Sequence, residues 1–443
     1  MPDETTKWSF GHRKADPLSP GTATLTPAAS PGGGVAEGVS SEVAPVPPVD
    51  ASAPSVAEML ADISSATTGV SDAFHENAAD NLSIHAILKQ AIDWGASDVM
   101  IAGGRRPISR VNGRMRQMED FPVLTSGESD RLLRSILKDS QLSALDREWE
   151  LDCSYELDGY RFRVNVHFQM HGLAAVFRLL GEKIFTPEQL GISDAIMKLC
   201  DLDQGLVIVT GPTGSGKTTT LATMIDKINR EKSYHILTIE DPVEIVHQEK
   251  YDCVITHREL GTHTQSFDNA LRSALREAPN VILVGEMRDF TTISLALTAA
   301  ETGHLVFATL HTMSASETVN RIIDVFPAEQ QGMVRAQLAG SLRAVVSQKL
   351  LFRIPKGRVA AREVMICNNA IANQIRTSRT HEIYSSIQSG AQEGMKTMEE
   401  HLAELVFEGL VEYDHAKAKA NDEKVFDSYL NSKLNKAVRK PAR

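Results

Sequence analysis

Gly205-Leu-Val-Ile-Val-Thr-Gly-Pro-Thr-Gly-Ser-Gly-Lys-Thr-Thr-Thr220 is the stretch of this sequence that decides its fold. Its apolar, β-branched beginning predicts a buried strand, and the residues from Leu221 to Arg230 have the spacing of a helix. Between them, a glycine, four residues and then Gly-Lys-Thr match a phosphate-binding loop, in which successive N–H groups point at one anion. We expect a run of residues here to bind nucleotide phosphates: Gly211, Pro212, Thr213, Gly214, Ser215, Gly216, Lys217, Thr218 and Thr219. In this pattern Lys217 reaches the β- and γ-phosphates and Thr218 holds Mg²⁺.

The composition limits the kinds of protein this can be. The chain has 443 residues, enough for two domains or more, and a formal net charge of -11, which argues against nucleic acid as a partner. It has no apolar run that could span a membrane, and Met1 to Ser9 lack the apolar centre of a signal peptide. We therefore expect a cytoplasmic protein whose contact with a membrane is peripheral. The four cysteines are scattered and fit neither a zinc site nor a disulfide framework.

Composition and periodicity divide the chain into four parts. Residues 1–80 are rich in Pro, Ala, Gly and Ser and predict a disordered extension, either a tether or docking arm or a passive tail. Residues 81–185 alternate short strands with helices and predict a small α+β domain, with a hairpin at Arg110 to Arg114 and a strand from Tyr160 to Gln169.

Residues 190–425 predict an α/β domain, because strands and helices alternate as in a mostly parallel sheet covered by helices. We expect the part from Ser314 to about Tyr413 to be helical. The last part, residues 426–443, predicts a basic tail that is either a solvated end or a contact for anionic lipid.

Two groups of carboxylates follow predicted strands. The apolar run Val281 to Val284 ends in Gly285-Glu286, and a charge at the end of a buried strand suits a residue that coordinates Mg²⁺ beside bound phosphate. Thr238-Ile-Glu-Asp-Pro-Val-Glu244 groups further acids. There Glu244 is our first choice for polarising the attacking water and Glu240 our second, and an ordinary acidic loop is the alternative.

Histidines and arginines complete the set of candidates. His304 and His311 bracket a predicted strand, and a regular strand would place them on opposite faces, so that either could sense the γ-phosphate or be structural. Arginines that could stabilise the transition state, or simply form surface ion pairs, are Arg161, Arg163 and Arg178 in the first domain and Arg272, Arg276 and Arg288 in the second.

From about residue 82 to residue 413 the sequence resembles the ATPases of type II secretion and type IV pilus systems, and specifically the PilT-type pilus retraction ATPases. Four motifs occur in the family's order: the Walker A loop at Gly211 to Thr218, the Asp box at Thr238 to Glu244, the Walker B run at Val281 to Glu286 and the His box at Gly303 to His311. The resemblance implies a PAS-like N-terminal domain joined to a RecA-like P-loop core, assembled into a homohexamer. It also implies hydrolysis of ATP with Mg²⁺ to work on an inner-membrane platform protein.

The resemblance also implies roles for matching residues. Lys217 and Thr218 would bind phosphate and Mg²⁺, Glu244 would be the catalytic acid of the Asp box, and Glu286 would be the Walker B acid. His304 and His311 match the His box, and Arg161, Arg163 and Arg178 match arginines that approach the phosphates.

Two features bear on the direction of the motor. Assembly-type relatives usually carry an extra N-terminal domain and a four-cysteine zinc motif, and the absence of both patterns favours retraction. Retraction enzymes carry Ala-Ile-Arg-Asn-Leu-Ile-Arg-Glu near the C-terminus, where this chain reads Ala370-Ile-Ala-Asn-Gln-Ile-Arg-Thr377. The alternatives to a retraction motor are an ATPase of a type IVB or conjugative secretion system and a weakly hydrolysing accessory to another motor.

Overall fold

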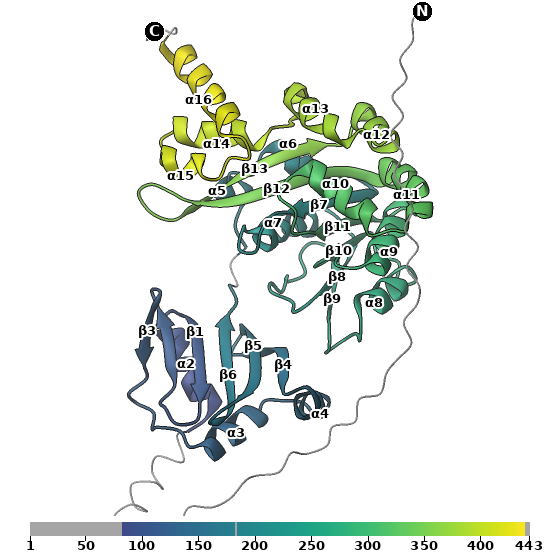
Figure 1. Ribbon diagram of the computed structural model, residues 1–443. Helices are drawn as coiled ribbons and strands as arrows, with labels where there is room; N and C mark the ends of the chain where they lie inside the picture. Colours follow the sequence, from purple (N-terminus) through teal and green to yellow (C-terminus); the bar gives the residue numbers. More distant parts are fainter. Residues whose placement is uncertain (1–81, 182–183, 439–443) are drawn as a thin grey trace, which may run out of the picture. The chain divides into compact units, whose positions relative to one another are not determined.

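The structure is a computed structural model that describes residues 82–181 and 184–438 (Figure 1). The extension predicted for residues 1–80 lies outside the described residues. None of the helices in the described ranges is long and apolar enough to cross a membrane.

The first described part is an α+β domain, as predicted. One antiparallel sheet has the strand order β3-β2-β1-β6-β5-β4. Its elements are α2 (Ile84–Asp93), β1 (Ala96–Ala102), β2 (Ile108–Val111), β3 (Arg114–Gln117), α3 (Ser126–Arg134), α4 (Asp139–Glu148), β4 (Glu150–Leu157), β5 (Tyr160–Gln169) and β6 (Gly172–Leu179). Strand β5 has the bounds that the sequence predicted, because Phe162, Val164 and Val166 alternate as buried residues on one face.

The second described part is built on a seven-stranded sheet with the order β13-β12-β7-β11-β10-β8-β9. All neighbours are parallel except β12 and β13. Its elements from residue 187 to residue 309 are α5 (Pro187–Leu190), α6 (Asp194–Met197), η1 (Lys198–Asp201), β7 (Gly205–Thr210), α7 (Lys217–Glu231), β8 (His235–Glu240), β9 (Val254–Glu259), α8 (Phe267–Ala274), β10 (Val281–Val284), α9 (Phe290–Glu301) and β11 (Leu305–Thr309). The predicted alternation of strands and helices is confirmed here.

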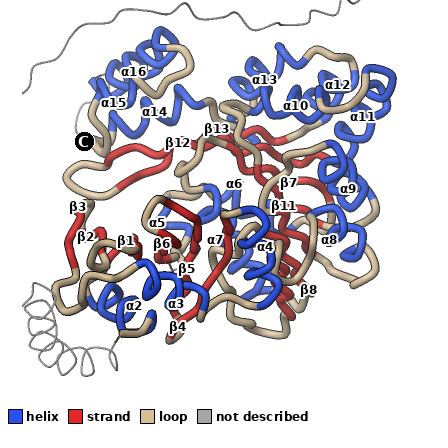
Figure 2. Tube along the Cα trace, turned by 60° about the horizontal axis from the view of Figure 1, so that its bottom comes forward, coloured by secondary structure: helices blue, strands red, loops and turns tan. Residues whose placement is uncertain are grey.

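Helices cover both faces of this sheet, as Figure 2 shows. Strand β7 is buried along its whole length, and its alternate residues serve two cores. Leu206 and Ile208 pack in the core shared with α8, α9, α10 (Ala315–Asp324) and α11 (Ala328–Ser341). Val207 and Val209 pack in the core shared with α6 and α7. Because β7 is buried on both faces, the sequence from Leu206 to Val209 is continuously apolar.

The expectation that residues from Ser314 to about Tyr413 are helical is confirmed on either side of residues 342–366 and was wrong within them. Two long strands, β12 (Leu342–Phe352) and β13 (Arg358–Ile366), interrupt the helices and form a hairpin, visible in Figure 1. Strand β12 pairs in parallel with β7 through Val345 and Val346, so the hairpin extends the central sheet. Both strands are buried along most of their length, polar residues such as Gln348 and Arg362 included, so neither has the alternation of apolar and polar residues that would have marked it as a strand.

A helical layer closes the chain. It consists of α12 (Asn369–Arg376), η2 (Thr380–Glu382), α13 (Ile383–Ser389), η3 (Ala391–Glu393), α14 (Met398–Phe407), α15 (Tyr413–Lys417) and α16 (Glu423–Val438). The predicted boundary of a basic tail at residue 426 falls inside α16, where Phe426 is fully buried in the core beneath α14. Lys433, counted as a tail residue, pairs with Glu404 at 3.0 Å. The predicted tail therefore includes, as far as residue 438, a helix that packs on the core through Phe426.

Candidate active site

The glycine-rich loop connects the end of β7 at Thr210 to the start of α7 at Lys217. Gly211 has a φ of 136°, and a Cβ placed there would lie 2.2 Å from the Gln348 carbonyl oxygen. Gly216 caps α7 with a φ of 90°. Only glycine suits both positions, and the turn leaves the positive end of α7 facing the loop. Strand, loop and helix thus follow the order that a phosphate-binding loop requires.

The side chain of Lys217, the first residue of α7, bonds back to the glycine-rich loop. Its Nζ donates to the Gly211 carbonyl at 2.9 Å and to the Pro212 carbonyl at 3.3 Å. Burial lowers the pKa of Lys217, and the negative charges of Glu286 and Glu244 act in the opposite direction. The structure therefore brings the lysine and both predicted carboxylates into one electrostatic environment.

Thr218 lies in the first turn of α7 and lines a small cavity of about 40 Å³. Glu240, Gly285 and Thr309 line the same cavity. Residues from α7 and from the ends of three neighbouring strands therefore meet beside the loop, at the carboxyl edge of the sheet where α/β proteins place their chemistry.

Glu286 follows β10 and is held by two side chains. Its carboxylate contacts Arg288 Nη2 at 2.7 Å and His311 Nε2 at 3.2 Å. Burial alone would raise the pKa of Glu286, but the bonds and charges of Arg288 and His311 outweigh it, and the pKa is lowered. Glu286 is therefore a charged carboxylate, which is the state needed to hold a cation.

The two candidate acids between Thr238 and Glu244, Glu240 and Glu244, differ in their surroundings. Glu240 ends β8 and is 8% exposed, and burial raises its pKa to about 7 while the charge of Glu244 adds to the shift. Glu244 follows the strand and is only partly buried. A partly exposed carboxylate near Lys217 is better suited to polarising a water molecule than a buried one.

The two histidines of the His box lie at opposite ends of β11. His311 follows the strand's carboxyl end and contacts Glu286. His304 precedes the strand, where its Nδ1 lies 3.1 Å from the Ala299 carbonyl and its own carbonyl accepts from Gly205 N. Because Gly205 begins β7 and the loop follows the end of β7, His304 does not join Lys217 and Glu286 within one chain. The two histidines are therefore separated by the length of β11, whereas the sequence predicted only that they would lie on opposite faces of the strand.

The arginines predicted in the first domain lie on β5 and β6 and are already engaged. Arg161 pairs with Glu259, and its Nε donates to the Val243 carbonyl at 2.9 Å. Arg163 lies 3.5 Å from Asp152, and Arg178 bonds the buried carboxylate of Asp98 at 3.0 Å. Each has a carboxylate partner in its present position, and their approach to a nucleotide stays a prediction.

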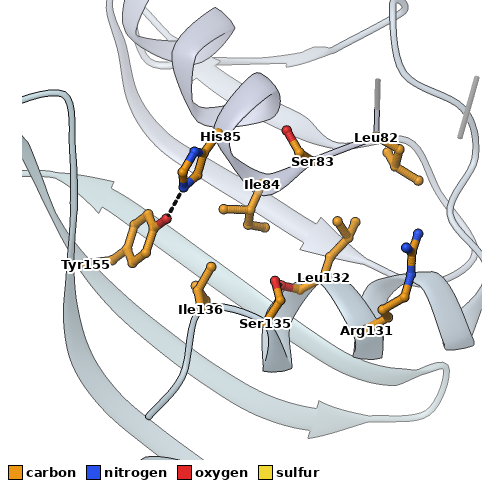
Figure 3. Close-up of a pocket in the computed structure, with 9 residues that line it drawn as sticks. All are labelled: Leu82, Ser83, Ile84, His85, Arg131, Leu132, Ser135, Ile136 and Tyr155. Atoms are coloured by element: carbon orange, nitrogen blue, oxygen red, sulfur yellow. Dashed lines mark hydrogen bonds between the residues drawn. The ribbon is translucent and has the colours of Figure 1, made fainter. Parts of the chain in front are cut away.

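A larger cavity of about 470 Å³ lies in the first domain (Figure 3). The start of α2, the end of α3 and Tyr155 of β4 line it, and His85 Nε2 lies 2.7 Å from the Tyr155 hydroxyl. It contains none of the residues that the sequence singled out. The candidate chemistry therefore belongs to the loop at the carboxyl edge of the core sheet.

Comparison with known proteins agrees with this geometry. The family model described as "Type II/IV secretion system protein" matches residues 75–425. The chain belongs to this family. It is 48% identical over 340 residues to the type IV pilus retraction ATPase PilT of Pseudomonas aeruginosa, covering 76% of this chain and 98% of that protein.

Two solved structures extend the comparison. The pilus retraction motor PilT with bound ADP matches with a TM-score of 0.74 and 44% identity, over 78% of this chain and 99% of that one. The ATPase DotB of Legionella pneumophila matches with a TM-score of 0.68 and 28% identity, over 75% of this chain and 93% of that one. Within the type II/IV secretion family, this chain is thus more similar to these PilT proteins than to DotB.

Proposed function

We propose that this protein is a PilT-type motor ATPase, which hydrolyses ATP to ADP and phosphate and uses the energy to retract a type IV pilus in twitching motility. The observation that carries the proposal is the loop before α7, in which Lys217 shares its surroundings with Glu286 and Glu244. Similarity to PilT proteins over nearly their whole length supports the same function.

The residues at the loop have separate tasks in hydrolysis. The N–H groups of the loop and the start of α7 bind the phosphates, and Lys217 gives up its two carbonyl contacts to neutralise the β- and γ-phosphate oxygens. Glu244 orients and polarises the attacking water. His311 and Arg288 keep Glu286 charged and correctly oriented.

The donor set also fits Mg²⁺, because a threonine hydroxyl and a charged carboxylate offer the hard oxygen ligands that this ion prefers. Thr218 and Glu286 are the residues that would hold the ion, which when bound neutralises charge developing on the phosphates.

We further infer the assembly and location of the motor from the resemblance to this family. The active form is a homohexamer in the cytoplasm, peripheral to the inner membrane, where it acts on a platform protein of the pilus machine. The domain of residues 82–181 is PAS-like and the core is RecA-like. A secretion ATPase is the second candidate, supported by the fold shared with DotB at lower identity.

Steady-state ATP hydrolysis by the purified full-length protein tests the enzymatic part of the proposal. Lys217→Ala should lower kcat at least a hundredfold. Lys227→Ala is the matched control, because Lys227 lies on the same helix but pairs with Asp201 and Glu231 away from the loop. Equal turnover by wild type and Lys217→Ala would refute the ATPase assignment.

A further inference from the structure

One buried side chain, Gln348 of β12, bonds both to the glycine-rich loop and to the helix that follows it. It is 1% exposed. Its Nε2 donates to the Ser215 carbonyl at 2.5 Å, and its Oε1 accepts from the Thr220 hydroxyl at 2.9 Å. Ser215 belongs to the loop and Thr220 to the first turns of α7, so a single carboxamide spans the loop and the helix that follows it.

The bond to Ser215 has a consequence for the loop's binding surface. The Ser215 carbonyl and the Gly216 N–H belong to one planar trans peptide, in which the C=O and N–H point in opposite directions. Gln348 holds the carbonyl toward β12, and this directs the Gly216 N–H away from β12. Orientation of successive N–H groups is what makes such a loop an anion site.

Arg362 of β13 holds Gln348 from the other side. The two residues are direct partners in the β12–β13 ladder, and Arg362 Nε donates to Gln348 Oε1 at 2.9 Å. Arg362 is 2% exposed, and burial lowers its pKa to about 10. In residues 82–181 and 184–438 it has no carboxylate partner within ion-pair distance. A buried cation bonded only to neutral oxygens is costly, which indicates that its position serves more than packing.

The other side-chain bonds of Arg362 reach the stretch through which the chain enters the core. Its Nη1 donates to the carbonyls of Leu190 and Gly191, both at 3.0 Å. Thr223 of α7 donates to the Phe185 carbonyl at 2.9 Å, a second tie between α7 and the same stretch. Residues 184–191 are thus bonded at two points to residues beside the glycine-rich loop, namely Arg362 and Thr223.

We propose that Gln348 and Arg362 are a positioning pair for ATP hydrolysis: Gln348 orients the Ser215–Gly216 peptide toward the phosphates, and Arg362 couples that peptide to residues 184–191. Nucleotide binding at the loop therefore changes the restraint on the segment that joins the two domains in sequence. This inference rests on the proposed ATPase function and adds to it residues that no motif of the family identified.

Two substitutions separate positioning from packing. Gln348→Glu keeps the Oε1 acceptor for Thr220 and Arg362 but puts a carboxylate oxygen against the Ser215 carbonyl, so the peptide loses its donor. Arg362→Lys keeps the charge and loses the forked donors. The control is Lys349→Met, at the next residue of β12, where the buried Lys349 bonds Asn421 and the Lys419 carbonyl instead of the loop.

The measurement is the affinity of the full-length protein for a fluorescent ADP, with KM and kcat for ATP and the thermal midpoint without nucleotide. Gln348→Glu should weaken ADP binding and raise KM at least tenfold, and Lys349→Met should leave both within twofold. Because Arg362 acts through Gln348, Arg362→Lys should weaken ADP binding alone but add little to Gln348→Glu. If Gln348→Glu and Lys349→Met lower the thermal midpoint alike and neither alters ADP affinity, the role is only structural and the proposal fails.

Hydrogen exchange of the wild-type protein tests the coupling without any substitution. On adding ADP, amides in residues 211–220 and in residues 184–191 should slow together. Protection of residues 211–220 alone would overturn the coupling. A wild-type protein that neither binds ADP nor hydrolyses ATP would instead refute the proposed function, so the two failures are distinguishable.

Discussion

His311 Nε2 lies 3.2 Å from Glu286 Oε1, so a residue after β11 contacts the acid that follows the neighbouring strand β10. The contact joins the predicted His box to the predicted Walker B acid within one chain. In the proposed mechanism His311 orients the Glu286 carboxylate while Arg288 holds the other oxygen, a task that needs no neighbouring subunit.

Replacing His311 should therefore impair turnover more than binding. We expect His311→Asn to lower kcat about tenfold, the order of effect of losing one oriented polar group at an active site, with ADP affinity within about twofold. His381→Asn is the control, because His381 is an exposed histidine in the helical layer, where it pairs with Glu382 at 3.9 Å. A variant with normal kcat would remove His311 from the site.

Glu244→Gln should abolish most hydrolysis while ADP still binds. The amide cannot act as a base, and the expected loss in kcat is about a hundredfold or more. Glu249→Gln in the same loop is the control, since Gln can still accept the hydrogen bond from Ile255 N. Greater loss from Glu240→Gln than from Glu244→Gln would exchange the roles assigned to the two acids.

Two of the loop's three glycines, Gly211 and Gly214, should differ in their tolerance of alanine. At Gly211 a Cβ meets the Gln348 carbonyl and the backbone conformation is open only to glycine, so Gly211→Ala should destabilise the fold by roughly 2–5 kcal/mol. At Gly214 a Cβ meets nothing within 4 Å, and only the positive φ opposes it, at about 1–2 kcal/mol. Urea unfolding at one protein concentration measures both, and equal losses would contradict the packing described for Gly211.

Stability should depend on pH through Glu363 of β13. Burial raises the pKa of Glu363 to about 7, with the charge of Glu399 adding and that of Lys349 opposing, and Oε1 accepts from Ala315 N at 2.7 Å. A raised carboxyl pKa means that the folded state binds the proton more tightly. This stabilisation is complete at low pH and is lost as pH rises through about 7.

Glu363→Gln keeps an acceptor for Ala315 and removes the titration. As the pH rises from 5 to 8, the wild-type protein should lose about 2–3 kcal/mol more of its free energy of unfolding than the variant loses. Parallel stability curves for the two proteins over this range would show that Glu363 titrates normally.

The parts of the fold and site that could be predicted are those that local chemistry dictates. The loop at Gly211 to Thr218 and the acid after β10 follow from phosphate binding and from a charge ending a buried strand. Strand β5 followed from its alternation. In each case a short stretch of sequence was sufficient to predict the local structure.

What could not be predicted depends on contacts between distant residues. Strands β12 and β13 are buried on both faces and have no strand periodicity, and α16 was hidden by its lysines although Phe426 packs beneath α14. Gln348 and Arg362 lie in the middle of those strands, so no motif marked them. The placement of His304 away from Glu286 required the length and register of β11.

The most direct test of the motor assignment is a count of surface pili by electron microscopy in cells whose only copy carries Lys217→Ala, with twitching measured in parallel. A retraction motor predicts that pili persist or increase while twitching is lost. Loss of pili would indicate an extension motor, and unchanged pili with normal twitching would contradict a role in pilus retraction altogether.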